Sequence, residues 1–460
     1  MGYSKKETRA VVLACCISGF ITPLLSTMMN LSLVNIGIDF NVGSHSLAYV
    51  NSAFLLASVI FMVPFAKLGD IIGKKKQFVI GLTIMIIGCV LASLSVDFWM
   101  VILGRAIIGA GASAMVTVSI SMLTDIVPPE KRGTSIGFQT MFVYMGLSVG
   151  PALGGALNDL IGWRLLFLII VPMAFVSMIV ILHGFKGDIK SDPDGKLDKK
   201  GSLLYGIAIM LSMAGVMNLP QLWAIISLVV GLIFLVLFIK SQIGNPQCLL
   251  EMNLFKNWTF SGSCLATFMS YGASYSMSFF LALYLQSIGQ LSATEAGLVM
   301  ITQPVIQCVL TPVFGRLTDK IQNKVILPTL GMAVTAIGLS TFMWYDLDTP
   351  LTMVIFTMII TGLGFSMFSA PNTTLIMSSV PRQYTGAASG MVGVMRQTGM
   401  MVSMGIAMLF ISVIMGSTDN LGPDTYGLFL EVMKISFIVC VIMCVVGTIT
   451  SAVRGKPKPF

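Results

Sequence analysis

Gly146-Leu-Ser-Val-Gly150-Pro151-Ala-Leu-Gly154-Gly155 places four glycines and a proline in a segment that is too apolar for a soluble loop. Gly146, Gly150 and Gly154 recur every four residues, so on a helix they form one bare groove where a second helix can approach closely. Pro151 removes a backbone donor and is expected to bend the helix. A membrane tolerates such a bend because neighbouring helices can satisfy the freed carbonyl. The stretch therefore predicts a kinked, tightly packed membrane helix.

The composition is that of a protein that crosses a membrane many times. Hydrophobic residues make up 56% of the chain, charged residues only 10%, and the mean hydropathy is +0.91, whereas soluble domains carry about 25% charged residues. A spanning helix needs roughly 20 apolar residues. Fourteen stretches approach this length: 10–38, 46–66, 78–96, 99–124, 134–160, 164–183, 203–218, 222–242, 258–286, 294–315, 325–345, 351–379, 387–415 and 426–452. The chain is therefore predicted to be an all-α polytopic membrane protein.

The net charge of +8 follows the predicted topology. If the N-terminus is cytoplasmic, the cytoplasmic segments hold nearly all Lys and Arg residues, whereas the external loops hold acids and Arg164. This positive-inside pattern predicts a multi-pass protein of the cell membrane with both termini, residues 1–9 and 453–460, in the cytoplasm. It also accounts for the basic charge without nucleic acid as a partner. No small-residue cleavage site follows the first residues, so no removable signal peptide is expected.

The sequence repeats itself at long range. Val127-Pro128, Gly133 and Gly137 recur with the same spacing as Val380-Pro381, Gly386 and Gly390, at an offset of 253 residues, and Asp70 corresponds to Asp319 at an offset of 249. Two correspondences at nearly one offset predict a duplicated six-helix unit. The predicted segments are a first bundle over 10–183, a solvated cytoplasmic linker over 184–202, two inserted helices over 203–242, a cytoplasmic loop over 243–257 and a second bundle over 258–452.

The ten-residue glycine string resembles the fifth-span signature of antiporters in the major facilitator superfamily. The order of six, two and six spans, with Gly162-Trp163-Arg164 and Arg396-Gln397-Thr398-Gly399, is similar to the fourteen-span drug:proton antiporter branch. The resemblance implies a major facilitator fold and alternating access between two halves. It also implies export of amphipathic or cationic small molecules in exchange for protons, without ATP or another cofactor. The expected partners are a small-molecule substrate and the bilayer, and the chain is expected to be a monomer.

The segment Lys67–Lys76 resembles the family's loop between spans two and three. The resemblance implies that Gly69, Asp70, Gly73 and Lys74 form a conformational latch, with Arg316 and Asp319 as a weaker second copy. From its chemistry, Asp70 could accept hydrogen bonds from helix N-terminal amides or pair with a cation from elsewhere in the chain. A plain basic membrane anchor would explain the lysines, but not the glycines that frame Asp70.

Four residues are candidates for coupling transport to an ion: Asn30, Arg105, Asp125 and Glu431. A charge inside a membrane costs ~2.5–3.5 kcal/mol on insertion, so Arg105 should face a cavity and a partner unless it extends to the outer interface. In the family, this arginine is implicated in proton coupling, and an acid is common in span one. Asn30 holds the position of that acid and cannot titrate. Asp125 lies at a cytoplasmic span end, and Glu431 is expected to pair with Lys434 on one helix face.

The resemblance implies that the first and fourth helices of each half line the substrate cavity. The candidates on these helices are Met28, Tyr271, Tyr275, Phe279, Phe365, Phe368 and Asn372. Aromatic faces attract lipophilic cations, and methionines suit promiscuous binding. Contact with lipid or between helices is the alternative role for each of these residues.

Several other chemistries find no support in the sequence. It contains no Walker A lysine loop, HExxH pair or nucleophile elbow, and its eight cysteines and two histidines lack metal-ligand spacing. No enzyme activity and no metal site are expected. Two alternatives remain open. One is a uniporter or a lipid or metabolite exporter of the same fold without proton coupling. The other is a polytopic enzyme or sensor, which should show clustered polar catalytic residues or a soluble signalling domain.

Overall fold

The computed structural model describes residues 3–42, 44–416 and 423–454 and is built from helices. The first group of six comprises α1 (Lys5–Phe40), α2 (Ser44–Ile72), α3 (Lys74–Ser93), α4 (Phe98–Ile126), α5 (Arg132–Ile161) and α6 (Trp163–Gly184). The last group comprises α9 (Trp258–Leu283), α10 (Ala293–Met300), α11 (Thr302–Lys320), α12 (Ile326–Ser340), α13 (Leu351–Ser378), α14 (Thr385–Phe410) and α15 (Tyr426–Val453). Between them run α7 (Lys199–Met217) and α8 (Leu222–Gln242).

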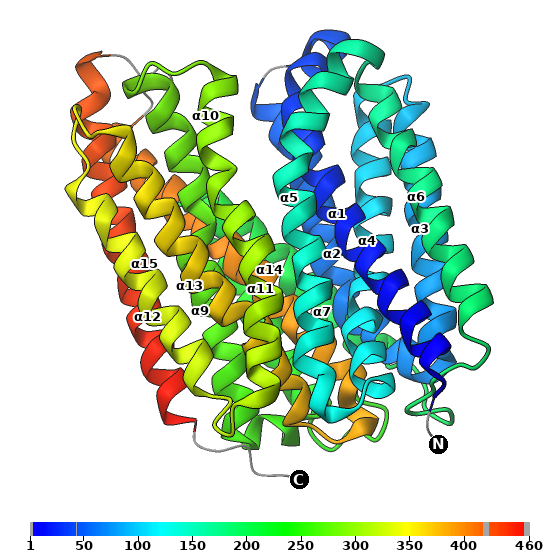
Figure 1. The fold of residues 1–460 in the computed structure, drawn as a ribbon. Helices are drawn as coiled ribbons and strands as arrows, with labels where there is room; N and C mark the ends of the chain where they lie inside the picture. The colour runs from blue at the N-terminus through cyan, green and yellow to red at the C-terminus, as the bar shows by residue number, and fades with distance from the viewer. Residues whose placement is uncertain (1–2, 43, 417–422, 455–460) are drawn as a thin grey trace.

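The two groups lie side by side as two bundles (Figure 1). They meet where α5 packs on α11 and where α14 packs on α2 and α4. Each of the fourteen apolar stretches coincides with a long helix, except that α10 and α11 share the stretch 294–315. That the bundles superpose as copies of one unit stays a prediction.

Within the described residues, twelve helical segments are long and apolar enough to cross a membrane. The helices α5 and α9 are not among the twelve, although they are as long as their neighbours and carry many Gly, Ser and Thr residues. Both pack inside the structure, α5 against α1 and α11, and α9 against α14 and α15. The polytopic all-α class is therefore confirmed, whereas the count of fourteen spans stays a prediction.

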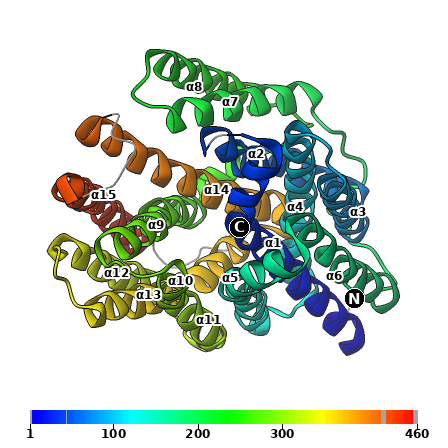
Figure 2. The ribbon, with the colours of Figure 1, turned by 90° about the horizontal axis from the view of Figure 1, so that it is seen from above.

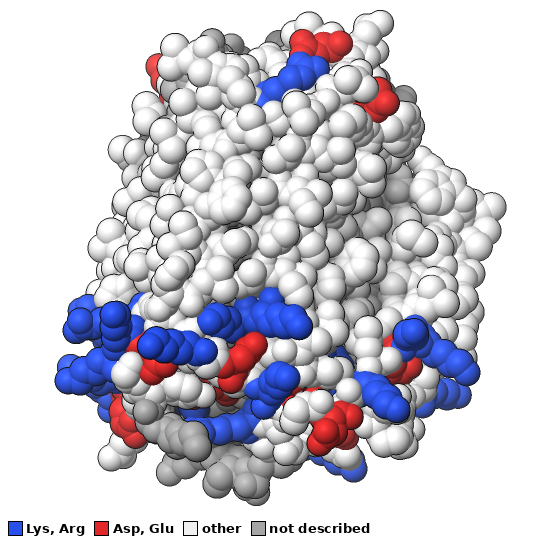
Figure 3. Space-filling model, turned by 90° about the vertical axis from the view of Figure 1, so that its right-hand side faces the viewer, with Lys and Arg blue, Asp and Glu red and all other residues white. Residues whose placement is uncertain are grey.

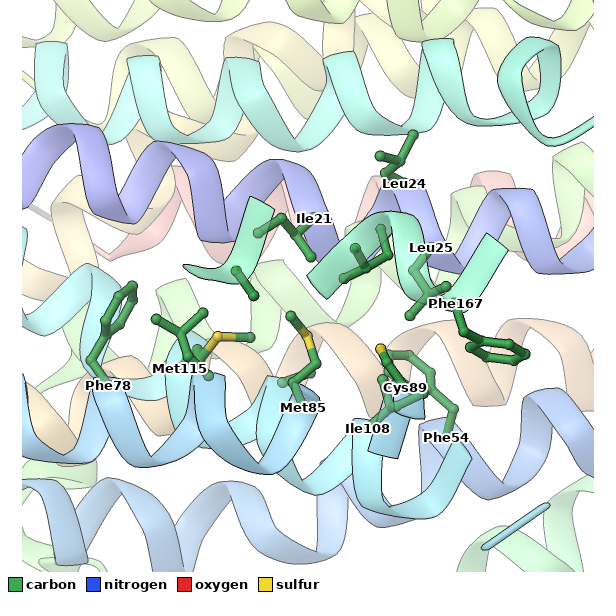
Figure 4. Close-up of a cluster of buried hydrophobic side chains, with 14 of the residues drawn as sticks. Ile21, Leu24, Leu25, Phe54, Phe78, Met85, Cys89, Ile108, Met115 and Phe167 are labelled. Atoms are coloured by element: carbon green, nitrogen blue, oxygen red, sulfur yellow. The ribbon is translucent and has the colours of Figure 1, made fainter. Parts of the chain in front are cut away.

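Each bundle has its own apolar core. Figure 4 shows part of the first core, where Ile21 and Leu25 of α1 face Met85 and Cys89 of α3 and Ile108 of α4. All five side chains are buried. Since lipid tails are as apolar as these side chains, the core is held by close packing between helices rather than by removal of apolar surface from water.

The helices α7 and α8 form a hairpin at the periphery (Figure 2). α7 contacts α2 of the first bundle and α14 of the second, and the Tyr205 hydroxyl donates a hydrogen bond to the Val59 carbonyl at 3.1 Å. A third apolar cluster joins this hairpin to both bundles, with Ile209, Met62 and Met391 among its members. The hairpin therefore covers one side of the seam between the bundles.

Basic residues gather at one end of the molecule (Figure 3). This basic end is where α1 begins and α15 ends (Figure 1), and it includes Lys67, Lys74, Lys75, Lys76, Lys131 and Arg132. At the opposite end Asp39 accepts hydrogen bonds from the Trp163 indole at 2.8 Å and from Arg164 at 2.6 Å. These bonds hold the pKa of Asp39 below its usual range.

Candidate functional site

A buried charge cluster joins the two bundles at the basic end. The Lys74 ammonium lies 2.5 Å from the carboxylate of Asp125, 3.5 Å from that of Asp70 and 2.8 Å from the hydroxyl of Thr385. The side chain of Lys74 is 0% exposed, and those of Asp70 and Asp125 are 5% and 8% exposed. We call these four residues the Lys74 cluster. Because Thr385 begins α14, the cluster links α2, α3 and α4 to the second bundle.

Close backbone approach makes this contact possible. A Cβ atom added to Gly386, the second residue of α14, would collide with the carboxylate of Asp70. The Thr385 hydroxyl also lies 3.2 Å from Asp125 and 3.1 Å from Ser121. Asp70 therefore pairs with a cation, but this cation is Lys74 of the same loop and not one from elsewhere in the chain as the sequence suggested.

Asp319, the counterpart of Asp70 in the second bundle, contacts the start of a helix in the first bundle. At the end of α11, its carboxylate accepts hydrogen bonds from the backbone amides of Gly133 and Thr134 at 2.8 Å each and from the Thr134 hydroxyl at 2.6 Å. These amides open α5, so an anion there is stabilised by the helix dipole. Arg316 does not pair with Asp319 among the described residues and lies over the ring of Phe138. The second copy therefore works as a helix cap without a buried cation.

Asp319→Ala is expected to lower the melting temperature of the purified protein. The change removes the acceptor of two amides at a helix N-terminus, and the loss of such a cap costs about 0.5–2 kcal/mol. Asp319→Asn should recover part of the loss, because asparagine also caps helices. Asp424→Ala, which removes an exposed acid at the opposite end, is the control. Equal melting temperatures for Asp319→Ala and Asp424→Ala would show that this contact contributes nothing.

The segment 184–202 is docked, whereas the sequence predicts a solvated linker. Asp188 accepts hydrogen bonds from the amides of Lys75 and Lys76 at 2.8 and 3.3 Å and so caps α3. Asp192 pairs with Lys67 at 2.7 Å, and its amide donates to the carbonyl of Asp70 at 3.0 Å. The linker thus provides the helix cap that the sequence would allow Asp70 to provide, because its acids lie opposite the run of lysines.

Arg105 is buried inside the first bundle. Its guanidinium donates hydrogen bonds to the Val50 carbonyl at 3.2 Å and to Asn51 at 3.0 Å and lies over the ring of Phe54. The side chain is 0% exposed, so it does not extend to the interface. One guanidinium nitrogen has no hydrogen-bond partner among the described residues. Within the described part of the chain, Arg105 thus has neutral partners from α2 and no carboxylate partner.

The glycine groove of α5 holds α1. Cβ atoms added to Gly146, Gly150 and Gly154 would meet, in turn, the Phe20 carbonyl, the Thr27 side chain and the backbone of Met28. Met28 is buried in this contact and does not line the central cavity. Pro151 and Gly155 also belong to α5, and Asn30 belongs to α1. The side chain of Asn30 and the surroundings of Gly155 lie outside the described part of the structure.

A small cavity lies between the bundles. Its polar lining includes Gln139, Thr140, Tyr144, Tyr271, Ser369 and Arg396. Arg396 is the twelfth residue of α14, Tyr144 the thirteenth of α5 and Tyr271 the fourteenth of α9, so all three lie well inside helices that start at the basic end. The free volume of about 30 Å³ holds one or two water molecules. The bundles must separate before an organic molecule can enter.

The predicted substrate contacts fall in different places. Tyr271 and Phe368 line the cavity, and Phe365 packs edge-on against Tyr271 with ring centres 5.1 Å apart. Tyr275 is 41% exposed, and neither it nor Phe279 lines the cavity. Only part of this set therefore meets at one site.

Asn372 is engaged elsewhere. Its amide group donates to the Thr267 hydroxyl at 2.8 Å and accepts from the buried Arg454 at 2.5 Å. Sequence reasoning counts Arg454 among the cytoplasmic charges, but the structure buries it at the end of α15. A substrate could reach the Asn372 amide only by breaking these bonds.

The structure also tests the ion pair that the sequence predicts on α15. Glu431 and Lys434 are both exposed on α15, and no ion pair joins them in the part of the chain that the structure describes. The predicted pair is therefore wrong for the described structure, in which both side chains are exposed and their charges stay separate. Arg396 and Tyr144 were missed as site residues. The argument from the cost of a charge inside a membrane, used above for Arg105, applies to Arg396 as well.

The chain is similar to a protein family and to several known transporters. A model of the Major Facilitator Superfamily matches residues 15–247 and 263–459. The riboflavin transporter RibZ of Clostridioides difficile is 27% identical over 391 residues, which cover 85% of each chain. The multidrug export protein EmrB of Haemophilus influenzae is 26% identical over 399 residues, which cover 84% of this chain and 77% of that protein. The solved structure of the proton:xylose symporter XylE has a TM-score of 0.71 at 13% identity, covering 97% of this chain and 95% of that chain.

Proposed function

Because the chain belongs to the Major Facilitator Superfamily, we propose that it is a secondary transporter that exports amphipathic small molecules from the cell by alternating access. It is a membrane transporter and not an enzyme. The observation that carries the proposal is the cavity between the bundles, and we assign its closure at the basic end to the Lys74 cluster and to Asp319. The relatives, a riboflavin transporter and a multidrug export protein, support a small organic cargo.

The cycle follows from this arrangement. We assign the basic end to the cytoplasm, as the positive-inside pattern predicts. Closing contacts at this end keep the cavity from the cytoplasm, and separating α14 from α4 and α11 from α5 opens it. Both closing contacts pair a side chain of one bundle with a helix start of the other. The bundles can therefore rock as two bodies around a central site, as in transporters built from two repeats.

Export could be coupled to protons or could proceed without a coupling ion. For proton antiport, the proton would bind Asp70 or Asp125, because no carboxylate lines the cavity among the described residues. A titratable group in contact with the gate would make closure depend on its protonation state. The same absence of a cavity carboxylate favours the second candidate function, export without proton coupling.

The test is dye efflux from proteoliposomes that contain the purified protein, without ATP, at a voltage fixed by a potassium gradient. Movement of an aromatic dye through protein-containing vesicles, but not through empty ones, is expected. Acceleration by a pH gradient, lost in both Asp70→Asn and Asp125→Asn, would identify antiport. Equal rates with and without the gradient would identify uniport. Absence of dye movement would contradict the proposed export function.

Asn30→Asp is expected to increase the dependence of efflux on the pH gradient. The change places a titratable group in the first helix, where the family commonly has one, so that a proton could bind there during the cycle. The same vesicles and fixed voltage measure the effect, with Asn30→Ala as the control for loss of the amide. Strong proton drive in the unchanged protein, abolished by Glu431→Gln or Asp125→Asn, would place the carrier elsewhere.

A further inference from the structure

The central cavity carries a positive charge, and no acid among its described lining residues balances it. Arg396 projects from the middle of α14 and lines the cavity. Among the described residues it forms no hydrogen bond and no ion pair, and no carboxylate lines the same cavity. A charged residue at this depth is usually paired or faces a water-filled pathway, and it marks a functional site.

A second observation comes from the other bundle. The hydroxyl of Tyr144, on α5, is buried in the cavity wall near the hydroxyls of Tyr271 and Ser369, but it completes no hydrogen bond of good geometry in the described part of the chain. In the second bundle, the Tyr271 and Ser369 hydroxyls lie 3.5 Å apart. A buried hydroxyl without a partner is costly, and an acceptor oxygen on a ligand would satisfy it.

The nearest buried acids do not balance Arg396. Asp70 and Asp125 lie at the basic end and are already paired with Lys74. The other membrane-embedded arginine, Arg105, also has neutral partners. An organic cation in the cavity would therefore meet repulsion from Arg396 without a compensating carboxylate, whereas an anion would be attracted.

Aromatic rings form the apolar part of the same wall. Phe368 lines the cavity, and the ring of Tyr271 is held edge-on by Phe365. Such rings offer an apolar surface to a flat aromatic molecule. The wall therefore combines one cation, several hydroxyl groups and an aromatic surface.

Resting on the proposed transport function, we propose that the site selects aromatic organic anions. Arg396 would bind the carboxylate of the substrate with its planar fork of donors, and Tyr144 would donate to the same anionic group. Since these residues belong to different bundles, a bound anion would connect the two halves across the cavity. The resemblance to drug antiporters implies amphipathic or cationic molecules, so for charged substrates the two expectations differ in the sign of the preferred charge.

The test compares two dyes that share the xanthene ring, anionic fluorescein and cationic pyronin Y. Their affinities for the full-length protein in lipid nanodiscs are measured by fluorescence anisotropy, with empty nanodiscs subtracted. Fluorescein is expected to bind at least about tenfold more tightly. Arg396→Gln should remove this preference by weakening fluorescein at least about tenfold. Arg396→Lys should lie between, because it keeps the charge and loses the fork. Tyr144→Phe should weaken fluorescein a few-fold.

Lys434→Gln is the matched control, since it removes a charge from an exposed face of α15 and should leave both affinities unchanged. Melting temperatures identify any variant that fails to fold. If Arg396→Gln fails to fold, Arg396→Lys still tests the anion site. Tighter binding of pyronin Y, or fluorescein affinity that is unchanged in both Arg396 variants, would overturn the anion site. Proteoliposome efflux of the same dyes tests transport separately. Charge-selective binding without efflux supports the anion site and contradicts the export function. Efflux without charge-selective binding supports the export function and contradicts the anion site.

Discussion

Lys74→Met is expected to reduce dye export to less than about a tenth and to lower the melting temperature more than any other single change at the basic end. The variant leaves Asp70 and Asp125 buried beside each other without the ammonium that lies between them. Removing one partner of a buried ion pair typically costs 3–5 kcal/mol, because the remaining charge is uncompensated. Repulsion between the carboxylates would also push α2 away from α4 and disturb the contact with Thr385.

A matched pair of variants tests this explanation. Lys67→Met removes the ion pair between Lys67 and Asp192, whose side chains are 15% and 39% exposed. Such a partly exposed ion pair contributes only about 0–1 kcal/mol to the free energy of unfolding. The double variant Lys74→Met with Asp125→Asn should regain part of the stability, since it removes one of the uncompensated charges. If Lys67→Met and Lys74→Met lose equal amounts of stability and export, the buried cluster has no special role.

Gly150→Leu is expected to abolish export while the protein still inserts into the membrane. A Cβ atom at this position would already overlap the side chain of Thr27 and lie 3.3 Å from the Leu24 carbonyl. The added side chain would force α1 from α5, and overpacking of this kind costs typically 1–3 kcal/mol. Two conformers of similar free energy would be unbalanced by that amount. Efflux and membrane expression, measured on the same cells, separate loss of transport from loss of protein.

Gly297→Leu is the control for this change, because a Cβ atom on Gly297 would meet nothing within 4 Å. The control should keep both expression and efflux. Gly150→Ala, which adds only the Cβ atom, should show an intermediate loss. Normal efflux in Gly150→Leu would mean that the groove is incidental to transport.

The helices and their order could be predicted from the sequence because each is encoded locally. Apolar runs, the repeated Val-Pro-Gly spacing and the glycine string all act through neighbouring residues. The contact of Asp319 with the start of α5 has a weaker signal, since only the duplication pairs these segments. The docking of 184–202 onto α3 has almost none, because a segment rich in Lys, Asp and Gly looks the same when it is solvated.

The predicted site was less accurate for a related reason. Whether a polar side chain faces a cavity or a partner depends on residues far away in the sequence. Asn372 and Arg454 lie 82 positions apart and bond to each other, but the sequence predicted only that Asn372 contacts the substrate and that Arg454 belongs to the cytoplasmic tail. Conversely, the cost of a charge inside a membrane could have drawn attention to Arg396, but its distinguishing property is that no carboxylate among the described residues lines its cavity. Such a lack can be recognised only when all neighbours are known.

The uncompensated charge of Arg396 has an electrical consequence. A site that opens alternately to either side of the bilayer experiences the potential of the side to which it is open, worth ~2.3 kcal/mol per elementary charge at 100 mV. In a cell that is negative inside, the empty carrier, with its positive site, would favour the inward-open state. A monovalent anion would neutralise the site, and the loaded carrier would then turn outward without working against the field. Membrane voltage alone would thus bias the cycle toward expulsion, with no proton required.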